Sequence, residues 1–154
     1  MMSLCCDVLC ALSGKTLSTA ESCTGGGIGS ALTDVPGSSA VYKGGVISYC
    51  NEIKHTILGV PDEMLDAYGA VSSPVAEAMA VGIRKLMKTD VAVSVTGLAG
   101  PSGDEYGNPV GTVYIGYADE KNEMALEYHF SGNREAVRNQ AIEASLKLIL
   151  MNSL

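Results

Sequence analysis

A short strand-like run that leads directly into a glycine-rich turn is the feature that most limits how this chain can fold. Thr16–Ala20 mixes apolar, small and β-branched residues, and the next seven, ESCTGGG, place hydroxyls and three glycines before a segment that ends at Leu32. Glycines let a backbone approach a ligand closely with free N–H groups aimed at an anion. We therefore predict a strand over Thr16–Ala20, a helix over Thr24–Leu32 and a ligand site between them, with Ser22 at the hinge.

Further strand patterns follow along the chain. Val41–Tyr49 contains a Gly-Gly pair that predicts a bulge or a close approach of two backbones. Asp90–Val95 is short, apolar and β-branched, as in a strand buried on both faces. Val110–Ala118 and Glu123–Phe130 flank a polar four-residue turn and predict an antiparallel hairpin. The chain therefore supplies strands for one mixed sheet.

The expected helices begin at capping residues or at residues that favour a helix start. They are a short helix over Asp7–Leu12, one capped by Asn51 that carries Lys54, one starting at Ser72-Ser73-Pro74 with Met79, Ile83, Leu86 and Met87 along one side, and a last one capped by Asn133. We predict a single domain over residues 1–154, a three-layer α/β/α fold with a mixed, mostly parallel central sheet and a ligand at the strand ends.

The segment between the Asp90–Val95 strand and the hairpin is a candidate second wall of the site. Thr96–Pro109 holds four glycines and two prolines and no pattern of regular structure. Loops of this length within a compact domain are often functional.

Charge and cysteine content exclude several classes of protein. Seventeen acidic against ten basic residues give a net charge of −7, which disfavours binding to nucleic acid or to an anionic membrane. Five cysteines without a CxxC pair indicate neither a disulfide framework nor a zinc site, and Met1–Leu12 lacks the features of a signal peptide or membrane span. We expect a cytoplasmic protein with reduced thiols.

Common phosphate and metal motifs do not fit. Gly25-x-Gly27 leads to Ser30, where a dinucleotide-binding fingerprint requires Gly or Ala, and no P-loop string occurs. His55 and His129 have no carboxylate or thiol cluster near them in sequence, so we expect no metal site.

Ser22 and Lys54 are the candidates for chemistry. The histidines form no recognisable triad with Ser22, but a lysine acts as general base when desolvation lowers its pKa, and Tyr49 could relay a proton. The competing interpretations are that Ser22 only caps a helix and that Lys54 is a surface charge. Cys23 is an alternative nucleophile, although most free cysteines are small buried hydrophobes.

Arg134 and Arg138 lie four residues apart at the start of the last helix. This spacing suits a phosphate clamp, and it suits a solvated helix face paired with Glu135 equally well.

Several blocks in order along nearly the whole chain resemble the CinA C-terminal domain family, the nicotinamide-nucleotide amidases. They are AESCTGG at Ala20–Gly26, Gly37-Ser38-Ser39, the segment from Gly45 through Tyr49 to Lys54, Leu58-Gly59-Val60, Gly69–Ser72, Thr96–Pro101, Pro109–Val113 and Phe130–Arg134.

The resemblance implies a three-layer domain that hydrolyses the carboxamide of nicotinamide mononucleotide to nicotinic acid mononucleotide and ammonia, without a cofactor. It assigns Ser22 as nucleophile, Lys54 as base and Tyr49 as an assistant. It also implies substrate contacts from Cys23, Thr24, Gly25, Gly26, Ser39, Thr96, Gly97, Gly100 and Arg134.

Two positions depart from the family pattern: Ser73 stands where Glu is frequent, and Asn133 where Asp commonly precedes the arginine. The resemblance implies a C-terminal domain standing alone, without the fused N-terminal domain of many members. The rival interpretation is a non-catalytic nucleotide-binding module linked to competence or DNA damage. Symmetric dimers are common among enzymes of this size, and we expect a homodimer.

Overall fold

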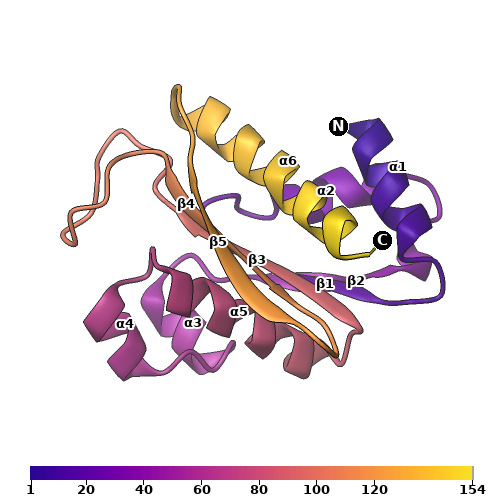
Figure 1. Ribbon diagram of the computed structural model, residues 1–154, viewed down its shortest axis with the longest axis horizontal. Helices are drawn as coiled ribbons and strands as arrows, with labels where there is room; N and C mark the ends of the chain where they lie inside the picture. Colours follow the sequence, from indigo (N-terminus) through magenta and orange to yellow (C-terminus); the bar gives the residue numbers. More distant parts are fainter. Residues whose placement is uncertain (154) are drawn as a thin grey trace.

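The computed structural model describes residues 1–153 and shows one sheet between two layers of helices (Figure 1). Its strands are β1 (Leu17–Glu21), β2 (Tyr42–Ile47), β3 (Val91–Gly97), β4 (Thr112–Ala118) and β5 (Glu123–His129), in the spatial order β2-β1-β3-β4-β5.

The sheet contains two parallel and two antiparallel strand pairs. β1 runs parallel to both β2 and β3, whereas the β3–β4 and β4–β5 pairs are antiparallel. The predicted α/β fold is confirmed, but the expectation of a mostly parallel sheet is wrong. A parallel pair needs a crossover, and β3, β4 and β5 are joined by a loop and a hairpin turn that contain no helix.

Within residues 1–153, six α-helices cover the sheet: α1 (Met2–Ala11), α2 (Gly27–Thr33), α3 (Asn51–Thr56), α4 (Asp62–Tyr68), α5 (Ser73–Met87) and α6 (Arg134–Asn152). Figure 1 shows α1, α2 and α6 over one face and α3, α4 and α5 over the other. None of these helices is long and apolar enough to cross a membrane.

Each helix layer packs on the sheet through its own apolar core. The larger core includes Ile28, Ile115 and Leu148 and lies beneath α1, α2 and α6. The smaller one includes Leu65, Met79 and Ile83 and lies beneath α4 and α5. The sheet therefore has two buried faces, as its apolar strands predicted.

The predicted bulge in β2 is confirmed. Leu17 pairs with Tyr42 but Ser18 pairs with Gly44, so Lys43 is the extra residue. A Cβ on Gly45 would lie 2.2 Å from Thr19 Oγ1, so only glycine allows β1 and β2 to approach this closely.

Helix boundaries differ from the predictions in several places. The first helix begins at Met2 rather than Asp7, because Cys5 is buried in the core like an apolar residue. Residue Asn51 is the first residue of α3 rather than its cap, and the N-cap Cys50 makes no side-chain bond. Leu86 is exposed rather than packed, and α4 was not predicted at all.

Two features that were predicted from polar side chains are confirmed, the cap of the last helix and the turn between the two hairpin strands. Asn133 accepts a hydrogen bond from the Ala136 amide and so caps α6. Asp119 accepts hydrogen bonds from the amides of Lys121 and Asn122 and closes the β4–β5 turn.

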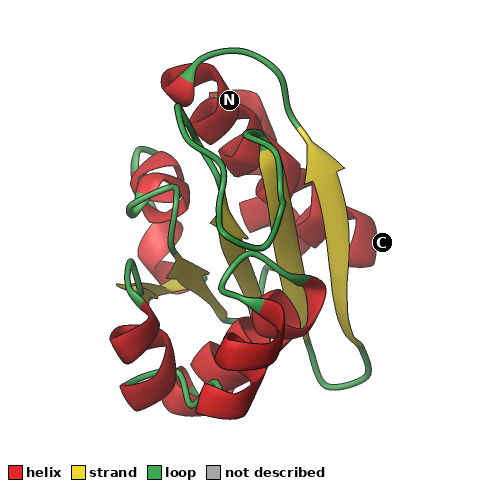
Figure 2. Cartoon of the chain, turned by 90° about the vertical axis from the view of Figure 1, so that its left-hand side faces the viewer, coloured by secondary structure: helices red, strands yellow, loops and turns green. Residues whose placement is uncertain are grey.

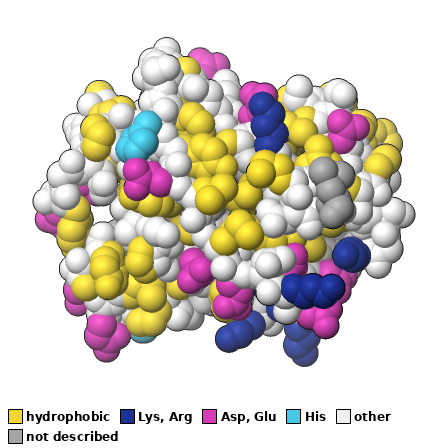
Figure 3. All heavy atoms as spheres, viewed as in Figure 1, with side chains coloured by type: hydrophobic (Ala, Val, Ile, Leu, Met, Phe, Trp, Pro, Cys, Tyr) yellow, Lys and Arg dark blue, Asp and Glu magenta, His cyan; other side chains and the backbone are white. Residues whose placement is uncertain are grey.

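β5 forms one edge of the sheet and crosses the front of the view in Figure 1. On this side of the molecule hydrophobic side chains gather across the middle, with charged side chains around them (Figure 3). Leu126 of β5 is one of the exposed large hydrophobic residues.

Candidate active site

Ser22 lies immediately after β1, at the carboxyl end of the parallel strands. Its amide donates to the Val95 carbonyl of β3, which extends the sheet pairing by one residue. The backbone then turns away through Gly25 and Gly26, whose φ angles of +59° and +98° favour glycine. The residue is 8% exposed, so it is held at the end of a rigid strand with little access to solvent.

Lys54 belongs to α3, which lies on the other face of the sheet from α2, and its side chain contacts Ser22. Its Nζ donates to Ser22 Oγ at 3.1 Å and to the Ser48 carbonyl at 2.7 Å, and the residue is only 1% exposed. Burial disfavours the charged ammonium and lowers the pKa of Lys54 to about 8, partly opposed by Cys50 and Cys23. A fraction of the amine is therefore neutral near pH 7, as a general base requires.

Both residues open onto a cavity of about 270 Å³. Lys54 and Arg134 are the charged side chains among its lining residues, which within residues 1–153 include no Asp or Glu. In a chain of net charge −7 this is a local reversal of sign that favours an anionic ligand. The lining residues are Ser22, Cys23, Tyr49, Asn51, Lys54, Ala70, Val71, Thr96, Gly97, Leu98, Ala99, Gly100, Ser102 and Arg134.

Arg134 bridges two walls of this cavity. Its Nη1 donates to the Gly100 carbonyl and its Nη2 to the Tyr49 hydroxyl at 3.0 Å. Tyr49 is 62% exposed and, within residues 1–153, makes no hydrogen bond to Ser22 or Lys54. Tyr49 therefore lies in the cavity wall next to Arg134.

Glu21 is a buried acidic residue of this turn that sequence reasoning did not single out. The carboxylate is 2% exposed and accepts hydrogen bonds from Thr24 Oγ1 at 2.7 Å and from the amides of Ile28 and Gly29. The anion at the start of α2 is therefore the protein's own, not a ligand's. The available signal was an acidic residue in the motif that precedes a predicted helix.

The predicted contact residues divide into two groups. Cys23, Thr96, Gly97, Gly100 and Arg134 line the cavity. Thr24, Gly25, Gly26 and Ser39 are not among its lining residues.

Three of the four exclusions have a structural reason. Thr24 is fully buried against Glu21, and Gly26 packs against Ile47. Ser39 precedes β2 and so lies at the opposite end of the parallel strands from Ser22, which follows β1.

Cys23 is next to the Ser22–Lys54 pair, called here the dyad, but burial makes its thiol a poor nucleophile. Desolvation raises the pKa of Cys23 to about 11, which outweighs the opposing influence of Lys54 and Arg138. The thiolate, which is the reactive form, is therefore rare at neutral pH.

Arg138 does not extend into the cavity with Arg134. Its Nε donates to the Cys23 carbonyl at 3.0 Å and its Nη2 to the Thr24 carbonyl at 3.1 Å. The two arginines therefore have different surroundings, and the paired phosphate clamp is not formed.

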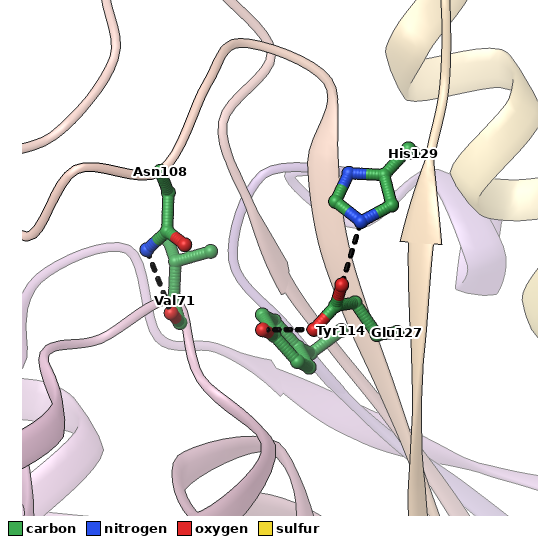
Figure 4. Close-up of polar contacts among 5 residues, drawn as sticks. All are labelled: Val71, Asn108, Tyr114, Glu127 and His129. Atoms are coloured by element: carbon green, nitrogen blue, oxygen red, sulfur yellow. Dashed lines mark hydrogen bonds and ion pairs between the residues drawn. The ribbon is translucent and has the colours of Figure 1, made fainter.

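The loop between β3 and β4 forms the second wall, as predicted from its composition. It is in the foreground of Figure 2, which views the end of the sheet where the loop projects. Asn108 Nδ2 donates to the Val71 carbonyl at 3.2 Å, and Tyr106 Oη donates to the Asp66 carbonyl at 3.1 Å (Figure 4 shows the Asn108 contact). These bonds join the loop to α4 and to the segment between α4 and α5.

A polar cluster on β4 and β5 lies beside this wall (Figure 4). Glu127 accepts from Tyr114 Oη at 2.5 Å and lies 2.6 Å from His129 Nε2. These hydrogen bonds, Tyr114 first, lower the pKa of the exposed Glu127 carboxylate. Within residues 1–153 no group of three or more His, Cys, Asp or Glu side chains converges as a metal site would require.

Comparison with known proteins identifies the family. A family model described as the CinA C-terminal domain matches residues 3–152. The chain belongs to the CinA family. A CinA-like protein of Endomicrobium trichonymphae is 48% identical over 135 residues, which cover 88% of this chain and 32% of that protein. A putative competence-damage inducible protein of Desulforudis audaxviator is 46% identical over 136 residues, 88% of this chain and 33% of that protein.

This CinA domain thus spans about a third of the length of the curated relatives it matches. Solved structures agree over almost the whole chain. The crystal structure of a CinA superfamily protein from Klebsiella pneumoniae superposes with a TM-score of 0.96 at 34% identity, covering 99% of this chain and 96% of that one. A competence/damage inducible protein from Agrobacterium tumefaciens gives 0.93 at 34% identity, covering 99% and 95%.

Proposed function

We propose that this chain hydrolyses the carboxamide of nicotinamide mononucleotide to nicotinic acid mononucleotide and ammonia, with Ser22 as nucleophile and Lys54 as general base. The observation that carries the proposal is the 3.1 Å contact between Lys54 Nζ and Ser22 Oγ at the floor of a cavity. A buried amine with a lowered pKa next to a serine hydroxyl is what a serine/lysine hydrolase requires.

The reaction follows from these contacts in two halves. Neutral Lys54 takes the Ser22 proton as Oγ attacks the carboxamide carbon, and the resulting ammonium donates its proton to the leaving nitrogen, which departs as ammonia. Lys54 then takes a proton from water, the water oxygen attacks the ester on Ser22, and the proton returns to Oγ as the acid is released. The Ser48 carbonyl holds Nζ in place through both halves.

The backbone amides of the turn after Ser22 are the candidates to bind the oxyanion of the tetrahedral intermediate. The amides of Gly25 and Gly27 donate to the Ser22 and Thr24 carbonyls, but those of Cys23 and Thr24 donate to no other residue within residues 1–153. An amide next to the nucleophile that has no acceptor is suited to stabilise a developing oxyanion.

The charge of the cavity supports a phosphorylated substrate. Arg134 at the mouth already holds the Tyr49 hydroxyl and the Gly100 carbonyl, which a phosphate could replace with charge-assisted bonds. Asn51 and Ser102 add neutral hydrogen-bonding groups to the lining.

A non-catalytic nucleotide-binding module is the rival candidate, because relatives carry names that refer to competence and damage induction. The same basic cavity would serve it. Such a module has no need for a desolvated lysine in contact with Ser22, since a buried amine is costly to maintain. We therefore favour the amidase over the nucleotide-binding module.

The test measures release of ammonia and of nicotinic acid mononucleotide from nicotinamide mononucleotide by the purified chain, beside Ser22→Ala and Cys23→Ala. Cys50→Ala is the matched control, because that thiol flanks the site but is exposed. We expect Ser22→Ala to lose turnover and both cysteine variants to keep it.

Two results would count against the amidase. Binding of the nucleotide by the parent chain without turnover would favour the module. Loss of turnover in Cys23→Ala, with Ser22→Ala still active, would transfer the nucleophile to the thiol.

A further inference from the structure

Two charged side chains outside the cavity hold the turn that carries Ser22. Glu21 lies beneath the turn and binds Thr24 and the start of α2. Arg138 reaches it from α6, more than a hundred residues further along the chain, and binds the carbonyls of Cys23 and Thr24. The turn is thus held on the sheet side through the Thr24 hydroxyl and on the helix side through the carbonyls of Cys23 and Thr24.

The geometry of the arginine is specific to a guanidinium. Nε and Nη2 sit in a rigid planar fork, and here they meet two successive carbonyls at 3.0 and 3.1 Å. A Cβ on Gly25 would lie 3.5 Å from Nη2, so the side chain also packs over the exposed turn. Lysine in its place could donate to either carbonyl but has no fixed spacing of donors.

The direction of a carbonyl sets the direction of the amide in the same peptide unit. A peptide bond is planar, and in the trans form its C=O and N–H point in opposite directions. The Cys23 carbonyl belongs to the unit that carries the Thr24 N–H, which donates to no acceptor within residues 1–153. By holding the carbonyl toward α6, Arg138 orients that N–H away from α6.

We propose that Arg138 is a positioning residue for the amide hydrolysis proposed above, setting the orientation of the Thr24 amide and of the turn behind Ser22. The inference rests on that proposed function. Arg138 touches neither Ser22 nor Lys54, and it is not among the residues that line the cavity. It therefore acts only through the backbone that it binds.

The experiment compares Arg138→Gln and Arg138→Lys with the parent. Arg84→Gln is the matched control, because Arg84 Nε also donates to a backbone carbonyl, that of Asp90, at the opposite end of β3. For each protein we would measure kcat, KM, the pH midpoint of kcat, the thermal midpoint, and the rate at which a fluorophosphonate probe labels Ser22.

We expect Arg138→Gln to lower kcat and the labelling rate on the order of 100-fold, the cost of a misplaced catalytic group. KM and the pH midpoint should stay unchanged, because substrate contacts and Lys54 are untouched. Arg138→Lys should recover part of the loss, and Arg84→Gln should behave like the parent.

Two results would overturn the inference. A raised KM with kcat unchanged would make Arg138 a substrate-binding residue. A folded Arg138→Gln protein with parental kcat and labelling rate would show that the contacts have no kinetic role. If the parent labels at Ser22 but does not turn over nicotinamide mononucleotide, the proposed function fails, and the labelling rates alone decide the role of Arg138.

Discussion

The burial of Lys54 sets the pH range over which this residue can act as a base. Its pKa of about 8 means that the neutral base is a minor species at pH 6 and a major one at pH 9. We predict that kcat/KM for nicotinamide mononucleotide rises about tenfold per pH unit below a midpoint near pH 8 and then levels off. A pH-rate profile on the parent and on Arg84→Gln checks this. A profile that is flat from pH 6 to pH 9 would contradict a role for neutral Lys54.

The same pKa makes a prediction for stability. The folded-state pKa lies below the unfolded value of 10.5, so between pH 8 and 10.5 the unfolded chain binds the extra proton and stability rises with pH. Relative to Lys54→Met, the parent should gain up to about 3 kcal/mol of unfolding free energy over this window, and none below pH 7. Urea unfolding of both proteins at pH 7, 8.5 and 10 measures the difference. A difference that does not change with pH would mean that Lys54 is not desolvated in the folded state.

At the scale of helices and strands, sequence predicted what depends on local pattern and missed what depends on topology. The β1 turn, the bulge in β2 and the Asn133 cap follow from the chemistry of a few adjacent residues, and all are present. Ser39 adjoins β2 in sequence, yet the direction of β2 places it at the far end of the sheet.

Two contacts around the site were not predicted, for the same reason. Arg138 meets Cys23 across more than a hundred residues of chain, and no periodicity in the sequence encodes this contact. Glu21 was visible in the motif, but only its burial under the start of α2 shows that it occupies the amides expected to bind a ligand.

The contact between α5 and the segment after α3 predicts a change in stability opposite to the one that helix propensity predicts. Replacing a glycine inside a helix by alanine normally stabilises by about 1 kcal/mol. A Cβ on Gly82 would lie 1.9 Å from the Leu58 carbonyl oxygen, so the helix or the segment must move. We predict that Gly82→Ala destabilises by about 1–3 kcal/mol, the usual cost of overpacking.

The control for Gly82→Ala is Lys85→Ala, an exposed position on the same helix that should change stability by less than about 0.5 kcal/mol. Chemical denaturation measures both. Because Leu58 follows α3, the displacement should also lower kcat through Lys54. A Gly82→Ala protein more stable than the parent would show that the two elements separate without cost.

The cap of α6 matters because that helix starts with Arg134. Asn133→Ala should cost about 1 kcal/mol, because the Ala136 amide loses its acceptor. Asn133→Asp keeps the acceptor and adds a charge that favours the helix start, so it should be at least as stable as the parent. Thermal unfolding ranks the three proteins. A rise in KM in the alanine variant alone would show that the cap helps to position Arg134. Equal stability of all three proteins would mean that the cap bond is not formed in solution.

At the scale of the whole molecule, the dyad joins the sheet to one of the two helix layers. Ser22 follows β1 and Lys54 comes from α3, while the larger core lies on the other face under α6. One sheet shared by both cores should make them unfold together, as is usual for a domain of this size. Leu65→Ala in the smaller core and Leu148→Ala in the larger each remove a buried side chain and should cost about 2–5 kcal/mol.

We predict that both variants show a single unfolding transition in urea, with loss of turnover and loss of helical ellipticity at the same midpoint. If Leu65→Ala lost turnover at a lower urea concentration than it lost ellipticity, the α3–α5 layer would be detaching on its own, and the dyad would depend on a unit less stable than the sheet.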